Sequence, residues 1–377
     1  MGFFKELYRN KYPIVGTTTV DIYVWEPAAD THRRLPGADA PRPAVSLIAT
    51  VKNEGKTIGQ WLDSIGAQSR PPDEIVIVDG GSTDDTWSIL QSTAARSPIL
   101  MKVLQSPGAN IARGRNLAID AAAGPLIAGT DAGCVLSRDW LAAISGPFAT
   151  DDTLDVVAGY TRGMAQTGLE SVIAAYFIAP VEAINAQTFL PSARSIAFTK
   201  QAWSRAGKFP EWLKLTAEDT LFDIQLKNAT QRWAFVPEAQ VVWRLKSTLR
   251  ELFVQVQTYA RGDGEAGLFP EDYRQRINLW IGLWITALVG ASGVVLAIAS
   301  GSIGWLILTA TAAARLVHRI RQITIHPVWV TGTHFSVGRF NRVKATAQSM
   351  LVALTISLAM CVGFLKGVQL ARSDDHS

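Results

Sequence analysis

Two aspartates follow short apolar stretches in the first half of the chain. Asp79 ends the stretch EIVIVD, and Asp131 follows PLIAGT. Carboxylates at the ends of buried strands can hold a cation or the hydroxyl groups of a ribose. The alternative is turn chemistry, because an aspartate after a strand often hydrogen-bonds its own backbone. The elements around the two residues must decide between a ligand site and a pair of turns.

Two arginines and a pair of acids also have both a functional and a purely structural interpretation. Arg113 and Arg115 fall near the start of a predicted helix, where guanidinium groups and the helix N-terminus can bind a diphosphate. Surface charge is the alternative for both. Glu218 and Asp219 fall in the first turn of a helix predicted over 215–228, where acids complement the helix dipole. That structural role would account for the pair without any chemistry.

The alternation of strands and helices along the chain relates these residues to one another. Apolar runs predict strands and a period near 3.6 predicts helices. The expected strands are 44–51, 74–81, 100–107 and 125–131, and the expected helices are 52–69, 82–95 and 109–124. Ser82 is expected to cap the second helix, with Asp85 closing a capping box. This alternation predicts an α/β fold with a doubly wound, mostly parallel, Rossmann-like sheet, in which Asp79 and Asp131 lie along one crevice at the strand ends.

The second half of the chain is much more apolar than the first. No charged residue occurs from Ile277 to Ala314, a stretch that would form ~57 Å of helix, close to twice the ~30 Å hydrocarbon core of a bilayer. A turn at 300–302 divides it, and a third charge-free run follows. We therefore expect an N-terminal extension and linker (1–43), a globular domain (44–265), and a helical membrane region (266–377) with spans near 278–299, 303–320 and 345–365.

Charges near the predicted spans indicate the orientation. The segment between the second and third spans contains four basic residues and no acid: Arg321, Arg339, Arg342 and Lys344. Basic loops stay on the cytoplasmic side, so the globular domain is expected in the cytoplasm at the inner or plasma membrane. The net charge of +4 is modest, which favours contact with membrane lipids over nucleic acid. A soluble protein with very apolar buried helices is the alternative.

Six motifs, taken in their order and spacing, resemble the family 2 inverting glycosyltransferases of GT-A fold. No single motif is decisive, but the ordered set is far more specific than any member. The resemblance covers residues 44–265, and C-terminal membrane spans are frequent in that family. The motifs are VSLIATVKNEGKTIGQWLDSI, EIVIVDGGSTDDT, ARGRNLAI, IAGTDAGCVLSRDWL, AEDTLFDIQL and YARG.

The resemblance implies a nucleotide pocket. Asn53, Glu54 and Asp79 would line the part that holds the base and the ribose. Arg115, with Asn116 beside it, would support this pocket from the third helix.

The resemblance also implies the residues around the reacting groups. Asp131 would be the first Asp of the D-x-D motif, which holds the nucleotide sugar and a divalent cation. Asp219, after Glu218 in the acidic pair, would be the catalytic base. Arg261 would belong to a C-terminal segment that gates the site or contacts the diphosphate.

Two departures from the family pattern bear on the cofactor. Gly80 stands where a second carboxylate often reads the base, and Gly133 stands where the second Asp of D-x-D often binds the metal. Metal dependence is therefore open. Mg²⁺ or Mn²⁺ could still be held by Asp131, the phosphates of the substrate and water, since Mg²⁺ commonly keeps several waters.

The expected function is inverting transfer of a sugar from a nucleotide sugar to a lipid-linked or surface-glycan acceptor, as in polysaccharide biosynthesis for the cell envelope. Asp219 would remove the proton of the acceptor hydroxyl. Two alternatives stay open. In a polyprenyl-phosphate sugar synthase the acceptor is a phosphate, which needs no base. In a non-catalytic partner of a glycan-assembly complex, the domain would bind the nucleotide sugar without turnover.

Overall fold

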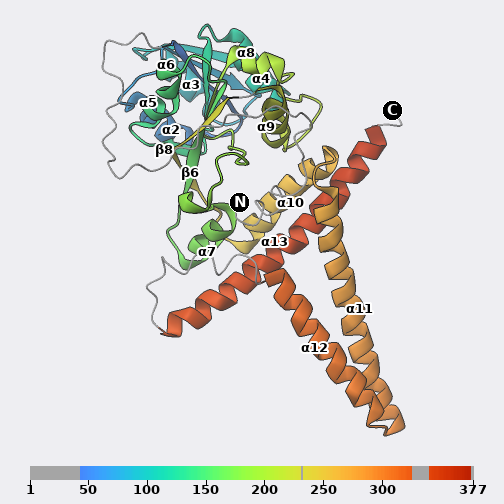
Figure 1. Ribbon diagram of the computed structural model, residues 1–377. Helices are drawn as coiled ribbons and strands as arrows, with labels where there is room; N and C mark the ends of the chain where they lie inside the picture. Colours follow the sequence, from blue (N-terminus) through green and yellow to red (C-terminus); the bar gives the residue numbers. More distant parts are fainter. Residues whose placement is uncertain (1–42, 231, 325–338, 375–377) are drawn as a thin grey trace. The chain divides into compact units, whose positions relative to one another are not determined.

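The computed structural model describes residues 43–230, 232–324 and 339–374 (Figure 1). Contacts divide the chain into two compact units. The sheet unit contains residues 43–164 and 178–245, and the helical unit contains residues 165–177 and the described residues after 245. The predicted extension over 1–43 falls almost wholly outside the described residues, and so does the greater part of the basic segment between the second and third predicted spans.

The sheet unit is built on one mixed sheet of eight strands. Their order is β3-β2-β1-β4-β7-β6-β8-β5. The first four strands pair in parallel, as the alternating pattern predicted, whereas β7 is antiparallel to both β4 and β6. The strands are β1 (Val45–Val51), β2 (Glu74–Asp79), β3 (Leu100–Gln105), β4 (Leu126–Gly129), β5 (Cys134–Leu136), β6 (Val156–Met164), β7 (Ile196–Thr199) and β8 (Trp233–Arg244).

Helices cover both faces of this sheet. Successive residues of a strand point to opposite faces, and here both faces carry apolar side chains that must be buried. Val45, Leu47 and Ala49 of β1 pack in one core with residues of α2, α3 and α5, whereas Ile48 packs in a second core with α4, α8 and α9. This confirms the doubly wound α/β fold. The helices of the unit are α2 (Ile58–Gly66), α3 (Thr86–Ala94), α4 (Ile111–Ala121), α5 (Trp140–Ser145), α6 (Pro147–Thr150), η1 (Val181–Ala183), α8 (Lys200–Arg205) and α9 (Glu218–Ala229).

The predicted cap of the second helix is wrong. Helix α3 begins later, with Asp85 as its N-cap and no hydrogen bond from the cap side chain. The hydroxyl of Ser82 donates instead to Oδ1 of Asp79 at 2.5 Å. The hydroxyl oxygen of Ser82 accepts from the backbone N–H of Asn53 at 2.9 Å, so Ser82 belongs to the turn after β2 and not to the start of α3.

The helical unit is held together by close contact between two helices. Its elements are α7 (Gly168–Phe177), α10 (Leu249–Glu265), α11 (Pro270–Ser300), α12 (Gly304–Thr324) and α13 (Arg339–Asp374). A Cβ atom added at Gly264 of α10 would lie 3.0 Å from the backbone nitrogen of Val368, and one added at Gly367 of α13 would lie 2.7 Å from that of Glu265. The glycines of the sequence ARGDGEAG thus lie mainly within α10 and let two backbones approach, as small residues do between packed helices.

Two helices of this unit are long and apolar enough to cross a membrane, by length and composition alone: α11 and residues Ala347–Ser373 of α13. Only 6% of the most apolar window of α11 is buried. Its exposed side chains include Trp284, Leu288 and Ile298. Helix α12 lies at the place of the second predicted span, and that span stays a prediction.

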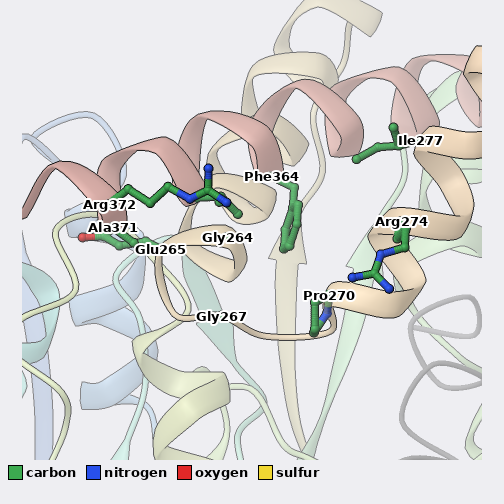
Figure 2. A pocket seen from close by; sticks show the side chains of 10 residues that line it. Gly264, Glu265, Gly267, Pro270, Arg274, Ile277, Phe364, Ala371 and Arg372 are labelled. Carbon is green, nitrogen blue, oxygen red and sulfur yellow. The ribbon is translucent and has the colours of Figure 1, made fainter. Parts of the chain in front are cut away.

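A pocket of about 490 Å³ lies within the helical unit (Figure 2). It is lined by the end of α10, the first turns of α11 and the last part of α13. The stacked rings of Tyr273 and Phe364, 4.0 Å apart, hold α11 against α13 beside it. Arg274 and Arg372 line the pocket together with the acid Glu265, and Arg274 pairs with Glu271 at 3.1 Å.

At the other end of the parallel strands from the strand-end aspartates, Glu74 is a buried structural acid. Its carboxylate accepts hydrogen bonds from Ser46, Lys102 and the backbone N–H groups of Ala123 and Gly124. Burial by itself would raise the pKa of Glu74, but these donors outweigh burial and lower its pKa from 4.5 to about 2. The acid therefore ties the starts of β1, β2 and β3 to the turn that leads into β4.

We predict that Glu74→Gln lowers the free energy of unfolding at pH 7. The pKa of Glu74 is lower in the folded protein than in the unfolded one, so the stabilisation by its carboxylate is complete above pH 4.5 and is lost as the pH falls toward 2. A pKa difference of this size corresponds to about 3 kcal/mol of unfolding free energy. Urea unfolding of the detergent-solubilised protein at pH 7, with melting temperatures from pH 7 to pH 3, measures the effect. Glu238→Gln, at an exposed acid, is the control, and equal losses in both variants would contradict the assignment.

Candidate functional site

The turn after β2 is organised by Asp79. This side chain is fully buried. Its carboxylate accepts from the backbone N–H and hydroxyl of Ser82 and from Nε2 of Gln105 at 3.1 Å. Asp79 thus fills the turn-shaping role that the sequence left open, and its predicted contact with the nucleotide stays a prediction.

Asn53 and Glu54 lie on the loop after β1 and are bonded to the same turn. Asn53 has a left-handed backbone, with φ of 56°, and its Oδ1 accepts from the backbone N–H of Thr83 at 2.8 Å. The backbone N–H of Glu54 donates to Oγ1 of Thr86 at 2.8 Å. Because β1 and β2 are parallel neighbours with Val51 beside Asp79, the two loops form one wall at the carboxyl end of the sheet.

Arg115 of α4 is the centre of the site. Its side chain is only 7% exposed and lies between two carboxylates. Nη1 is 2.5 Å from Oε1 of Glu218 and Nη2 is 3.0 Å from Oδ1 of Asp131. The structure therefore brings together three of the residues that the resemblance selected, although they are far apart in the sequence.

The first turn of α9 presents the acidic pair. Ala217, just before it, has φ of 72°, a left-handed conformation that costs free energy in a residue other than glycine. Burial raises the pKa of Glu218, opposed by Arg115 and assisted by the charge of Asp219. Asp219 is half-buried, and its Oδ1 accepts from the backbone N–H of Thr220 at 2.9 Å. Glu218 is thus bound to Arg115, and Asp219 is the member of the pair more open to solvent.

Three other predicted site residues lie in different surroundings. Asn116 is buried, and its Oδ1 accepts from Nε1 of Trp203 and from the backbone N–H of Phe209, so it joins α4 to α8 and the segment after it. Arg113 is exposed on α4. Arg261 belongs to α10 in the helical unit, where its backbone packs against Gly363 and Gly367.

Arg194 is a site residue that the sequence reasoning missed. Its Nε is 3.9 Å from Oδ2 of Asp131. The feature that reveals Arg194 is the register of the sheet, in which β7 runs antiparallel to β4 with Gly129 beside Ile196. Asp131 lies two residues after Gly129 and Arg194 two residues before Ile196, so in this antiparallel register the two residues face each other. No pattern in one strand alone reveals such a pair.

The carboxylate set does not fit a divalent cation held by side chains of this chain. Such ions need several oxygen ligands. Residue 133 is a glycine, and both carboxylate oxygens of Asp131 face guanidinium groups. Within the described ranges, no three His, Cys, Asp or Glu side chains come together in a group that could hold a metal.

We predict that Arg115→Met lowers the free energy of unfolding strongly, by about 3–5 kcal/mol, because it leaves Glu218 buried without its partner. The double variant Arg115→Met/Glu218→Leu should lose less than the single one, since it removes the stranded charge as well. Arg205→Met, which breaks the exposed ion pair with Asp155, should cost less than about 1 kcal/mol. Urea unfolding of the variants gives the comparison. Additive losses in the double variant would show that the pair is not coupled.

Part of the chain matches the model of a known protein family. Residues 46–195 match the family model for glycosyl transferase family 2. A validoxylamine A glucosyltransferase of Streptomyces hygroscopicus subsp. limoneus is 28% identical over 157 residues, which are 40% of this chain and 34% of that protein. Glycosyltransferase AglE of Haloferax volcanii is 29% identical over 101 residues, 26% of this chain and 33% of that protein. The match thus spans about a third of the length of these relatives.

A solved structure has a similar fold. The mannosyltransferase PcManGT of Pyrobaculum calidifontis, in complex with GDP-Man and Mn²⁺, has a TM-score of 0.53 and 20% identity, with 84% of this chain and 87% of that chain covered. At this identity the likeness shows the fold alone. It confirms the GT-A fold expected from the motifs. Residues 46–195 thus match glycosyl transferase family 2, the sheet unit has the GT-A fold, and two long apolar helices follow it along the chain.

Proposed function

We propose that this chain is a membrane-anchored, inverting glycosyltransferase that moves a sugar from a nucleoside diphosphate sugar to a hydroxyl of a lipid-linked or surface-glycan acceptor. The supporting observation is the buried guanidinium of Arg115, which joins Glu218 of the acidic pair to Asp131 at the end of β4. Through it, Glu218, the neighbour of the proposed base Asp219, and the proposed donor-site carboxylate belong to one hydrogen-bonded cluster.

Asp219 is the general base of the proposed reaction. Its carboxylate takes the proton of the acceptor hydroxyl while the hydroxyl oxygen attacks the anomeric carbon. The bond between that carbon and the phosphate oxygen breaks on the opposite face, and the nucleoside diphosphate leaves. The configuration at the anomeric carbon is inverted. Glu218 positions Asp219 through its bond to Arg115.

The nucleotide end of the donor is assigned to the loops after β1 and β2. Asn53 and Glu54 present polar groups there, and Asp79 holds the shape of the wall. Asp131 lies further along the same sheet edge, with its side chain 31% exposed. PcManGT, a protein of the same fold, was solved with GDP-Man, which supports a nucleotide sugar as the donor class. It was also solved with Mn²⁺, but the carboxylates of this site give no reason to assign a step to a cation.

The membrane region is proposed to bring the enzyme to its acceptor. Helix α11 exposes apolar side chains along a length sufficient for one crossing. A site held near a bilayer can meet a lipid-linked acceptor by diffusion in the plane of the membrane. We place the catalytic domain on the cytoplasmic side of the inner or plasma membrane, following the basic segment between the predicted second and third spans.

One observation favours a second candidate, transfer to a lipid phosphate. The pocket of the helical unit combines Arg274 and Arg372 with one acid, Glu265, and with apolar walls from Ile277 and Phe364 (Figure 2). Guanidinium groups beside an apolar surface suit a phosphate on a hydrocarbon chain. A phosphate acceptor has no proton to lose at neutral pH, so this reaction would proceed without a base.

We predict that Asp219→Asn lowers the rate of nucleoside diphosphate release about 10²–10⁴-fold, the usual contribution of a general base. The assay uses detergent-solubilised protein, a panel of UDP- and GDP-sugars, and membrane lipid extract as the source of acceptor. Donor binding, measured by calorimetry, should stay within about threefold of wild type. Asp120→Asn, at an exposed acid of α4 that pairs with Lys208, is the matched control.

The outcomes separate the candidates. Selective release that is lost in Asp219→Asn and kept in Asp120→Asn supports transfer to a hydroxyl. Release that survives in Asp219→Asn contradicts the base assignment and favours the phosphate acceptor. Donor binding without release in wild type contradicts turnover with the acceptors supplied.

A further inference from the structure

Arg194 is held in a fixed position beside the donor-site carboxylate. Its guanidinium lies 4.3 Å from the centre of the Trp243 ring. Its Nη1 donates to Oγ of Ser192 at 2.8 Å. Trp243 is in turn placed by strand pairing with Cys134, the first residue of β5, three residues after Asp131. A stacked and hydrogen-bonded arginine loses little conformational freedom when it binds an anion, because its planar group is already oriented.

The guanidinium of Arg194 places a positive charge beside the candidate donor-site carboxylate. Arg194 comes from the residues just before β7, and Asp131 from those just after β4, which is its antiparallel neighbour. The Nε to Oδ2 separation of 3.9 Å is longer than a hydrogen bond. A ligand oxygen can therefore share this guanidinium with Asp131. Arginine suits phosphate because its N–H groups match two oxygens at once.

Arg115 is less able than Arg194 to bind a phosphate of a ligand. It is 7% exposed, against 19% for Arg194, and it is occupied by Glu218 and Asp131 at hydrogen-bond distances. Removing it from Glu218 would strand a buried charge. Of the two guanidinium groups at Asp131, Arg194 is the one that a donor can reach at low cost.

The neighbouring thiol gives no alternative cation ligand. Burial raises the pKa of Cys134 to about 12, with Arg194 acting in the opposite direction and Asp131 and Glu54 assisting burial. The Cys134 side chain is buried, and Mg²⁺ and Mn²⁺ prefer oxygen ligands. Arg194, Asp131 and Glu54 all act electrostatically on this one thiol.

We propose that Arg194 binds the diphosphate of the donor and supplies the positive charge there, so that donor binding and glycosyl transfer do not require a divalent cation. This inference rests on the proposed function of the site as a nucleotide-sugar site. When the bond from the anomeric carbon to the phosphate oxygen breaks, the electron pair stays on the departing diphosphate. A guanidinium already in place stabilises this charge without reorganisation.

The first test measures binding of UDP and GDP to the full-length protein in detergent by calorimetry, with Mg²⁺, Mn²⁺ or EDTA. Wild type should bind the preferred nucleotide within twofold in all three conditions. Arg194→Gln should weaken binding about 10–100-fold, the range for a charge-assisted hydrogen bond, and Arg194→Lys should restore part of the loss. Binding of the nucleoside without phosphates should not change in Arg194→Gln. A variant that only disturbed the structure of the site would weaken nucleoside binding as well. Arg205→Gln, an exposed arginine that pairs with Asp155, is the control.

The second test restores the missing carboxylate with Gly133→Asp. A Cβ at this position would meet nothing within 4 Å, and the backbone is outside the left-handed region. The substitution should therefore fold normally, with Gly133→Ala as the steric control. We expect nucleotide binding by Gly133→Asp to become dependent on Mg²⁺ or Mn²⁺ and to fall at least tenfold in EDTA, while Gly133→Ala behaves as wild type.

Each result has a definite meaning. Wild-type binding that falls tenfold or more in EDTA, or an Arg194→Gln variant that binds as wild type does, overturns the role of Arg194 and leaves the proposed function standing. Folded wild-type protein that binds neither nucleotide in any condition contradicts the nucleotide-sugar site itself, and the inference with it.

Discussion

The buried guanidinium of Arg115 connects three parts of the sheet unit that are remote in sequence. It lies on α4 and reaches both the loop after β4 and the first turn of α9. A buried charge is costly unless partners of opposite sign surround it with good geometry. The two carboxylates satisfy this condition, and each of them is in turn restricted by the arginine. The relative positions of Asp131 and the acidic pair thus follow from one requirement of charge compensation.

The acids of the sheet unit fall into two groups according to their exposure. Asp79 and Glu218 are buried and have their hydrogen-bond capacity taken up by neighbouring protein groups. Asp131 and Asp219 are half-buried and face solvent at the edge of the same cluster. Binding and catalysis need carboxylates that a substrate can reach, such as Asp131 and Asp219. The buried carboxylates of Asp79 and Glu218 fix the geometry around them. The carboxylates that reach solvent are therefore the ones to which binding and catalysis are assigned.

Much of the fold was predictable because it depends on local patterns. Apolar runs and helical spacing located the first four strands and the helices between them, and the strand-end rule located Asp79 and Asp131. Ser82 was misassigned because its hydroxyl has two possible partners, and the choice depends on the burial of Asp79. Arg194 was missed because its pairing depends on the register of β7 against β4, which brings together residues 63 positions apart. The contact of α10 with α13 was also outside the reach of local patterns, although its glycines are visible in the sequence.

The glycine at position 133 and the arginine at position 194 are two parts of one electrostatic arrangement. A donor site with two carboxylates and a divalent cation has a net charge of zero where the diphosphate binds. A single carboxylate beside one guanidinium has the same net charge and needs no ion. The second arrangement is possible here because β7 is antiparallel to β4, which brings a residue from before one strand beside a residue from after the other. Loss of the carboxylate without the arginine would leave the anionic donor facing Asp131 with no positive charge except the guanidinium of Arg115, which Glu218 already engages.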